Sequence, residues 1–170
     1  MLMSRSSGYT WALSDAAVLA ILTAKDESTM ARQWRIQYVR GFLLAVPATI
    51  VNIISWGLLA YATNNSSARQ LYTTAAITTG SGTIFAWTAL RDINGALSIR
   101  SAKIAGPWTG VGNLPLTYSV KEKRSIDMAG KYSTTELVVK WKNYNLARSV
   151  ILLVGTLIGA YALTFADNFP

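Results

Sequence analysis

The sequence predicts an all-α integral membrane protein, a four-helix bundle whose helices two and four extend into the cytoplasm. Hydrophobic residues make up 51% of the chain and charged residues only 14%, whereas a soluble domain carries about 25% charged residues. The charges are clustered, so long apolar runs lie between them. The basic residues fall in alternate loops between these runs, as membrane topology requires.

Four apolar runs are the predicted spans of a single membrane domain. A bilayer core of about 30 Å needs roughly 20 apolar residues in a helix. The shortest run contains Asp15, and its alternative interpretation is a signal peptide. Asp15 interrupts the run, however, and no small-x-small cleavage site is obvious before Lys25. The predicted spans are residues 9–24, 41–61, 71–90 and 146–165 of the domain 1–170.

The basic residues orient these spans. Most of them lie in residues 25–40 and 98–145, which the positive-inside rule places in the cytoplasm. Both termini are then expected in the lumen of the endoplasmic reticulum. Four spans satisfy this arrangement and three do not, so the charges support the first span independently. Within the second loop, the Gly- and Pro-rich residues 105–115 are expected to be irregular, as a lid over the bundle or as a plain connector.

Two helices are expected to continue beyond the membrane. Ser133 and Glu136 have the spacing of a capping box. This pattern predicts a helix from about Thr134 to Phe165, longer than the membrane needs. The second helix is expected to begin near residues 28–30, and Pro47 should kink it inside the span.

The residue inventory excludes several functional classes. The chain has no Cys and no His, which excludes disulfides, imidazole or thiolate metal sites, and Ser-His or Cys-His catalysis. Only carboxylates could hold a metal, and no cluster of them is visible, so we expect no metal site. The net charge of +8 would suit nucleic acid, but the placement of the basic residues favours membrane topology. The expected partners are therefore the lipid bilayer and a hydrophobic small molecule, and not nucleic acid.

Helical spacing groups the polar residues of the fourth helix on its inward face. Trp141, Asn145 and Arg148 share one stripe with Gly155 and Gly159. The two glycines form a GxxxG motif, which lets helices approach closely. The stripe predicts that Asn145 and Arg148 point into the bundle, and the motif also offers a surface for a homo-oligomer.

The second and third helices repeat this arrangement. Trp34, Tyr38 and Asn52 share a face of the second helix, with small residues between them. A buried Asn in a span often only bonds a neighbouring helix. At the end of the third span, Asn94 shares a face with Arg91.

Topology brings the polar ends of these helices together and predicts a pocket with apolar walls and a polar mouth. Such a pocket suits a hydrophobic, oxygen-bearing small molecule. Arg40 and Arg148 taken singly also fit the alternative of membrane anchors, whereas Asp92 gains nothing from the positive-inside rule. Asp15 would lie inside the membrane, where ionisable groups are usually functional, unless the first span is shorter than drawn. The converging residues are Trp34, Arg40, Arg91, Asp92, Asn94, Trp141, Asn145 and Arg148.

Three motifs occur in a familiar order along the chain, namely QWRIQYVRGFLLAVP, INGAL and WKNYNLAR. They resemble the Gln-Trp…Tyr…Gly…Pro, Thr-Asn-x-x-Leu and Trp-x-x-x-Asn-x-x-Arg motifs of the fungal anthrone-oxygenase-like family. These are small four-helix membrane proteins of secondary metabolism. The chain departs from the family at Phe85-Ala86, where relatives tend to have Tyr-Thr, and at Asp92-Ile93, where they tend to have Pro-Thr.

The resemblance implies a membrane-embedded tailoring enzyme that oxygenates an anthrone-type methylene of a polycyclic, polyketide-like substrate without a cofactor. Asp92 would be the base. Arg91 or Arg148, with Asn94 and Asn145, would hold the oxyanion. The substrate would be bound by Trp34, Tyr38, Arg40, Asn52, Trp141 and Asp15.

Two alternatives remain open at this point. A cofactor-free cyclase or isomerase of a polyketide or terpenoid would use Asp92 or Asp15 as a carboxylic acid kept protonated by its apolar setting. The departures from the family pattern favour this alternative. A non-catalytic membrane scaffold subunit is the other, and the absence of His and Cys fits it.

Overall fold

The computed structural model describes residues 16–106 and 122–165, and the secondary structure in these two ranges is entirely helical. The all-α class predicted from the sequence is therefore confirmed for the described chain. Asp15 and the other residues of 9–15, which open the first predicted span, lie outside the described residues. The helices are α2 (Val18–Leu22), α3 (Glu27–Ala62), α4 (Ser66–Ala89), α5 (Arg91–Ala105), α6 (Lys123–Lys131) and α7 (Thr134–Phe165).

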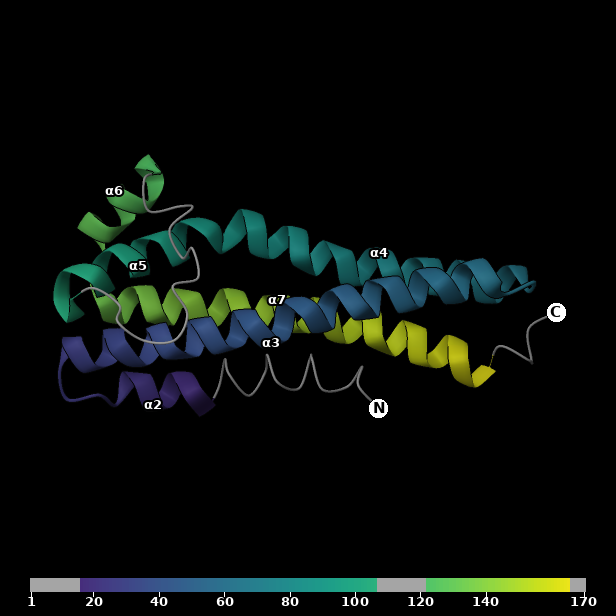
Figure 1. Cartoon of the computed structure of the whole chain (residues 1–170), viewed down its shortest axis with the longest axis horizontal. Helices are drawn as coiled ribbons and strands as arrows, with labels where there is room; N and C mark the ends of the chain where they lie inside the picture. The colour runs from purple at the N-terminus through teal and green to yellow at the C-terminus, as the bar shows by residue number, and fades with distance from the viewer. Residues whose placement is uncertain (1–15, 107–121, 166–170) are drawn as a thin grey trace.

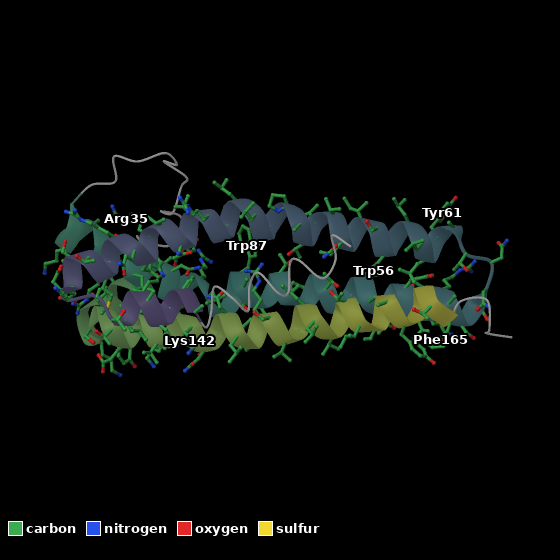
Figure 2. All side chains as sticks on the ribbon, turned by 90° about the horizontal axis from the view of Figure 1, so that it is seen from below. Arg35, Trp56, Tyr61, Trp87, Lys142 and Phe165 are labelled. Atoms are coloured by element: carbon green, nitrogen blue, oxygen red, sulfur yellow. The ribbon has the colours of Figure 1, made fainter. Side chains whose placement is uncertain are left out.

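Three long helices, α3, α4 and α7, run side by side along the molecule (Figure 1). Both α3 and α7 begin at the same end, and α5 continues from α4 toward that end (Figure 1). Helices α2 and α6 also pack there, on α3 and α5 respectively. We call this end the basic end, because among the described Lys and Arg residues only Arg69 belongs to a different part of the bundle. Figure 2 shows Arg35 and Lys142 toward the basic end, and Tyr61 and Phe165 at the far end.

Side-chain caps decide where the long helices begin. Asp26 accepts a hydrogen bond of 2.8 Å from the Thr29 amide, so α3 begins at Glu27, one residue before the predicted range. The Ser133 amide donates to Glu136 Oε2 over 2.8 Å, and the Glu136 amide donates to Ser133 Oγ over 3.2 Å. This is the predicted capping box, and α7 has the predicted bounds.

The connection between the third and fourth spans is more helical than expected. Within the predicted cytoplasmic segment 98–145, α5 continues to Ala105 and α6 occupies Lys123–Lys131. The chain bends at Leu90 between α4 and α5. Beyond the bend, Ile93 and Leu97 remain almost fully buried, which shows that the apolar face continues past the polar residues. Of the predicted lid 105–115, residues 107–115 lie outside the described residues.

The GxxxG motif of α7 packs within the chain. A Cβ atom at position 155 would lie 2.6 Å from Thr79 Oγ1 of α4. A Cβ atom at position 159 would collide with the indole ring of Trp56 on α3. Only glycine leaves room for these neighbours. The surface that the sequence offers for a homo-oligomer is thus used for packing α3 and α4 against α7.

Helices α3 and α7 are each long and apolar enough to cross a membrane. Only 22% and 28% of their most apolar windows are buried inside the protein, whereas the core helix of a soluble protein is mostly buried. Helix α4, predicted as the third span, has sufficient length at 24 residues but is rich in Thr. Among the described helices, α3 and α7 alone meet both criteria, so the four-span bundle stays a prediction.

Candidate functional site

Three aromatic side chains form a cluster where α3 and α7 meet at the basic end. Trp34 and Tyr38, one turn apart on α3, stack with ring centroids 5.3 Å apart. Trp141 of α7 meets Trp34 edge-on, with ring centroids 6.3 Å apart. Trp34 is completely buried and the other two rings nearly so. We call Trp34, Tyr38 and Trp141 the aromatic cluster.

Asn94 joins this cluster from α5. The indole Nε1 of Trp141 donates a hydrogen bond of 3.0 Å to Asn94 Oδ1, and Asn94 is only 8% exposed. The bond occupies the carbonyl end of the amide, so the Nδ2 group is the end left to donate. The prediction that Asn94 and Trp141 converge is therefore met by a direct hydrogen bond.

Asn145 supports the cluster from within α7. Its Nδ2 atom donates to the Trp141 carbonyl over 3.0 Å, and its own carbonyl accepts from Ser149 Oγ over 2.8 Å. One of its two amide hydrogens is therefore committed to its own helix. Asn145 is buried as predicted, but its observed contacts stabilise the turn that carries Trp141.

Two buried donors next to the aromatic cluster lack hydrogen-bond partners among the described residues. These are Trp34 Nε1 and Arg148 Nε. The first belongs to a ring that stacks on Tyr38, and the second to Arg148, which follows Trp141 by two helical turns on one face of α7. A buried unsatisfied donor costs about 1–3 kcal/mol. A ligand oxygen beside Tyr38 would offset that cost by accepting from these donors.

The first residues of α5 are placed differently from Asn94. Arg91 forms an ion pair of 2.5 Å with Glu122, and both side chains are more than two-fifths exposed. Asp92 is half-buried and lies two residues before Asn94, which puts it on the opposite side of the helix. The structure therefore brings Asn94 into the cluster, while Arg91 is held near the surface by Glu122.

The other predicted site residues lie apart from the cluster. Arg40 is exposed. Asn52 is buried, but it follows Trp34 by 18 residues of continuous α3, about 27 Å along a helix. Asp15 lies outside the described residues. The candidate site is thus smaller than the sequence predicted.

Two arginines that the sequence analysis did not single out organise the basic end. Arg35 is buried and donates from both terminal nitrogens to the Gly106 carbonyl, each over 3.2 Å. Arg100 of α5 donates to the carbonyls of Ala129 and Tyr132 over 2.9 and 2.6 Å, and to Glu27 over 3.3 Å. These bonds span 29 to 73 sequence positions, so no local pattern could have revealed them.

No group of three or more metal-ligating side chains occurs within residues 16–106 and 122–165. The aromatic cluster offers two indoles and one phenol. Asn94, Asn145 and Arg148 add two amides and one guanidinium. Such a set offers flat apolar surface together with hydrogen-bond donors. It is suited to an aromatic molecule that carries oxygen.

The fold and the site define an all-helical protein with two membrane-length apolar helices and a buried aromatic and polar cluster near their start. The family model for anthrone oxygenase matches residues 34–158, which is most of the chain. The chain belongs to the anthrone oxygenase family, as its motifs predicted. The matched region begins at Trp34 and contains every residue of the cluster. No curated protein and no solved structure matches the chain.

Proposed function

We propose that this protein is a membrane-embedded tailoring enzyme that oxygenates an anthrone-type ring methylene of a polycyclic, polyketide-like substrate to a quinone. The observation that carries the proposal is the buried edge-on contact of Trp34 with Trp141, to which Asn94 is hydrogen-bonded, in a member of this family. The chain supplies no His or Cys for redox or metal chemistry. We accordingly propose a reaction that uses no cofactor.

The proposed reaction requires acid–base and electrostatic catalysis from the protein. Loss of a proton from the methylene gives an electron-rich enolate, which can pass an electron to O₂. One oxygen atom of O₂ becomes the new quinone oxygen, and the other leaves as water with the two methylene hydrogens. The protein must accept the proton and stabilise the developing oxyanion.

Arg148 is the better of the two predicted oxyanion-binding arginines. It follows Trp141 by two helical turns on one face of α7, whereas the Arg91 side chain is 42% exposed and paired with Glu122. A cation in a water-excluded site interacts more strongly with a developing charge than one at the surface. Asn94 Nδ2 would be the second donor, since its Oδ1 is engaged by Trp141. The indole rings would bind the flat face of the substrate.

The same proposal places α3 and α7 across the membrane of the endoplasmic reticulum, with the basic end in the cytoplasm and both termini in the lumen. The mostly exposed apolar windows of the two helices support it. The gathering of Lys and Arg at one end is the pattern of the positive-inside rule. A substrate dissolved in the bilayer would reach the cluster laterally, near the membrane surface.

One observation favours a second candidate function, a cofactor-free cyclase or isomerase. Phe85, which stands where relatives tend to have Tyr, stacks on Tyr144 of α7 with ring centroids 6.0 Å apart. An apolar ring thus stands at the contact of α4 with α7, where relatives tend to have a hydroxyl, which favours a reaction different from that of the relatives.

Oxygen uptake and product mass test both functions together. Purified protein in lipid nanodiscs is mixed with a hydroxylated anthrone in an oxygen electrode, and the product is analysed by mass spectrometry. We expect uptake above the spontaneous rate and a product that has gained one oxygen and lost two hydrogens. Arg148→Met should lose this rate, while Arg69→Met at the far end should keep it. A wild-type rate equal to the spontaneous one contradicts the oxygenase, and a product of unchanged mass supports the isomerase.

A further inference from the structure

We propose that Tyr38 is the proton acceptor of this site and that Arg148 activates it. The inference rests on the proposed function, because it assigns the group that removes the methylene proton. It replaces the sequence-based assignment of that role to Asp92.

The position of Tyr38 is the first reason. It is 9% exposed and stacks on Trp34, one turn earlier on α3. Arg148 follows Trp141 by two helical turns on one face of α7, which begins at the same end as α3 and meets it at Trp34 and Trp141. The two unpartnered donors of the site are Trp34 Nε1 and Arg148 Nε. A substrate oxygen bound by these donors would therefore lie beside the Tyr38 ring.

The described carboxylates are engaged in other contacts or lie on other helix faces, which is the second reason. Asp26 and Glu136 cap helices, Glu27 accepts from Thr134, and Glu122 pairs with Arg91. Asp127 is exposed on α6. Asp92 lies across α5 from Asn94. With no His or Cys in the chain, Tyr38 is the group of the aromatic cluster that can exchange a proton.

The chemistry of the transfer is the third reason. The ionised Tyr38 Oη takes a proton from the ring methylene, the C–H bond breaks, and its electron pair moves to the substrate oxygen. The enol form of an anthrone is itself a phenol, so the donor and the acceptor are acids of one class. Proton transfer between groups of matched acidity is the efficient case. The negative charge moves from one oxygen to another and stays beside Arg148 throughout.

The later steps return the enzyme to its starting state. The enolate reacts with O₂ and forms a ring peroxide anion. Cleavage of its O–O bond, with transfer of the second methylene hydrogen to the departing oxygen, gives the quinone and hydroxide. The hydroxide takes the proton from Tyr38 and leaves as water. O₂ is the oxidant, and Tyr38 is ionised again for the next turnover.

Anaerobic isotope exchange tests the assignment separately from oxygenation. The full-length protein in nanodiscs is mixed without O₂ with an anthrone whose ring methylene is deuterated, and loss of deuterium to water is followed by NMR. We expect wild-type protein to accelerate the loss. Tyr38→Phe, which keeps the stacked ring, should reduce the catalysed rate by roughly 100-fold or more. Tyr72→Phe is the matched control, because Tyr72 is also a buried tyrosine stacked on a tryptophan.

Two variants of Arg148 separate activation from folding. Arg148→Lys keeps the positive charge and should retain part of the exchange rate at an unchanged melting temperature. Arg148→Met removes the charge and should lose the rate as Tyr38→Phe does. A loss of rate in the Lys variant equal to that in the Met variant would contradict an activating charge.

The outcomes distinguish this inference from the proposed function. If deuterium exchange requires Tyr38 but the protein takes up no O₂ in air, the assignment of Tyr38 as proton acceptor is supported and the oxygenase function is contradicted. Exchange that persists in Tyr38→Phe but is lost in Asp92→Asn overturns the assignment in favour of the carboxylate. Absence of catalysed exchange in the wild-type protein also overturns the assignment of Tyr38, even where O₂ uptake is observed.

Discussion

Trp141 on α7 donates its indole hydrogen to the side-chain carbonyl of Asn94 on α5, 47 positions earlier in the chain. Both residues are at most 8% exposed. The bond therefore fixes α5 against the pair of long helices and holds one wall of the candidate site. The buried indole has one hydrogen to donate. The stability of the contact between α5 and α7 therefore depends on the side-chain amide of Asn94.

Replacing Asn94 with Leu should destabilise the fold by about 1–3 kcal/mol, because the buried indole hydrogen of Trp141 loses its acceptor. Thermal unfolding of the detergent-solubilised protein measures the effect. Asn143→Leu on the exposed face of α7 is the matched control and should leave the midpoint nearly unchanged. Equal midpoints for the Asn94 variant and wild type would show that the bond does not contribute to stability.

Replacing Gly159 with Ala should destabilise the far end by about 1–3 kcal/mol, because the new methyl group collides with Trp56. Gly57→Ala adds the same group to an exposed helical position with open space around it. That control should be neutral or stabilising by up to about 1 kcal/mol, since Ala is the better helix former. Combining Gly159→Ala with Trp56→Leu should recover part of the loss, and strict additivity of the two changes would contradict a direct collision.

Stability should fall in acid partly through Glu27, which lies outside the predicted spans. The hydrogen bond from Thr134 holds the pKa of Glu27 below its ordinary value, with a smaller contribution from Arg100. A depressed pKa means that this contribution is complete above the ordinary value and is lost as the pH falls through the folded value. Glu27→Gln should therefore be less stable than wild type at neutral pH, and the difference should vanish in acid. Parallel pH profiles for the two proteins would contradict this assignment, and Asp127→Asn is the exposed control.

The absence of Cys from the chain makes the proposed topology directly measurable. Lys103→Cys places one thiol at the basic end, and Asn64→Cys places one in the connection between α3 and α4 at the far end. In sealed microsomes, a membrane-impermeant thiol reagent added outside should label the first variant. The second should be labelled only after the membrane is opened. Labelling of both variants in sealed vesicles would contradict two helices that cross the bilayer.

Local sequence patterns predicted several elements correctly. The start of α7 followed from Ser133 and Glu136, whose capping interactions join residues three positions apart. The burial of Trp34, Trp141 and Asn145 followed from helical spacing alone. These features depend on neighbours within one or two turns, which the sequence displays directly.

Other features depended on partners that the sequence does not reveal. The two predicted arginines looked equivalent, and only the packing of α6 beside α5 paired Arg91 with Glu122. The motif of Gly155 and Gly159 predicted a close approach of helices. It did not predict that Thr79 and Trp56 would be the residues packed against these glycines. The extension of the helix to Ala105 was not predicted, because polar residues after Leu90 interrupt the apolar run, although Ile93 and Leu97 remain buried.

By itself, the sequence determined the helical class, the apolar helices, the family motifs and the face of each helix that carries Trp, Asn and Arg. These are consequences of composition and of the period of the α-helix. The tertiary structure decided which of those faces meet. It brought Trp34 of α3 edge-on to Trp141 of α7 and joined Trp141 to Asn94 of α5. The physical reason is that helical period assigns a residue to a face, while its partners come from helices distant in the chain.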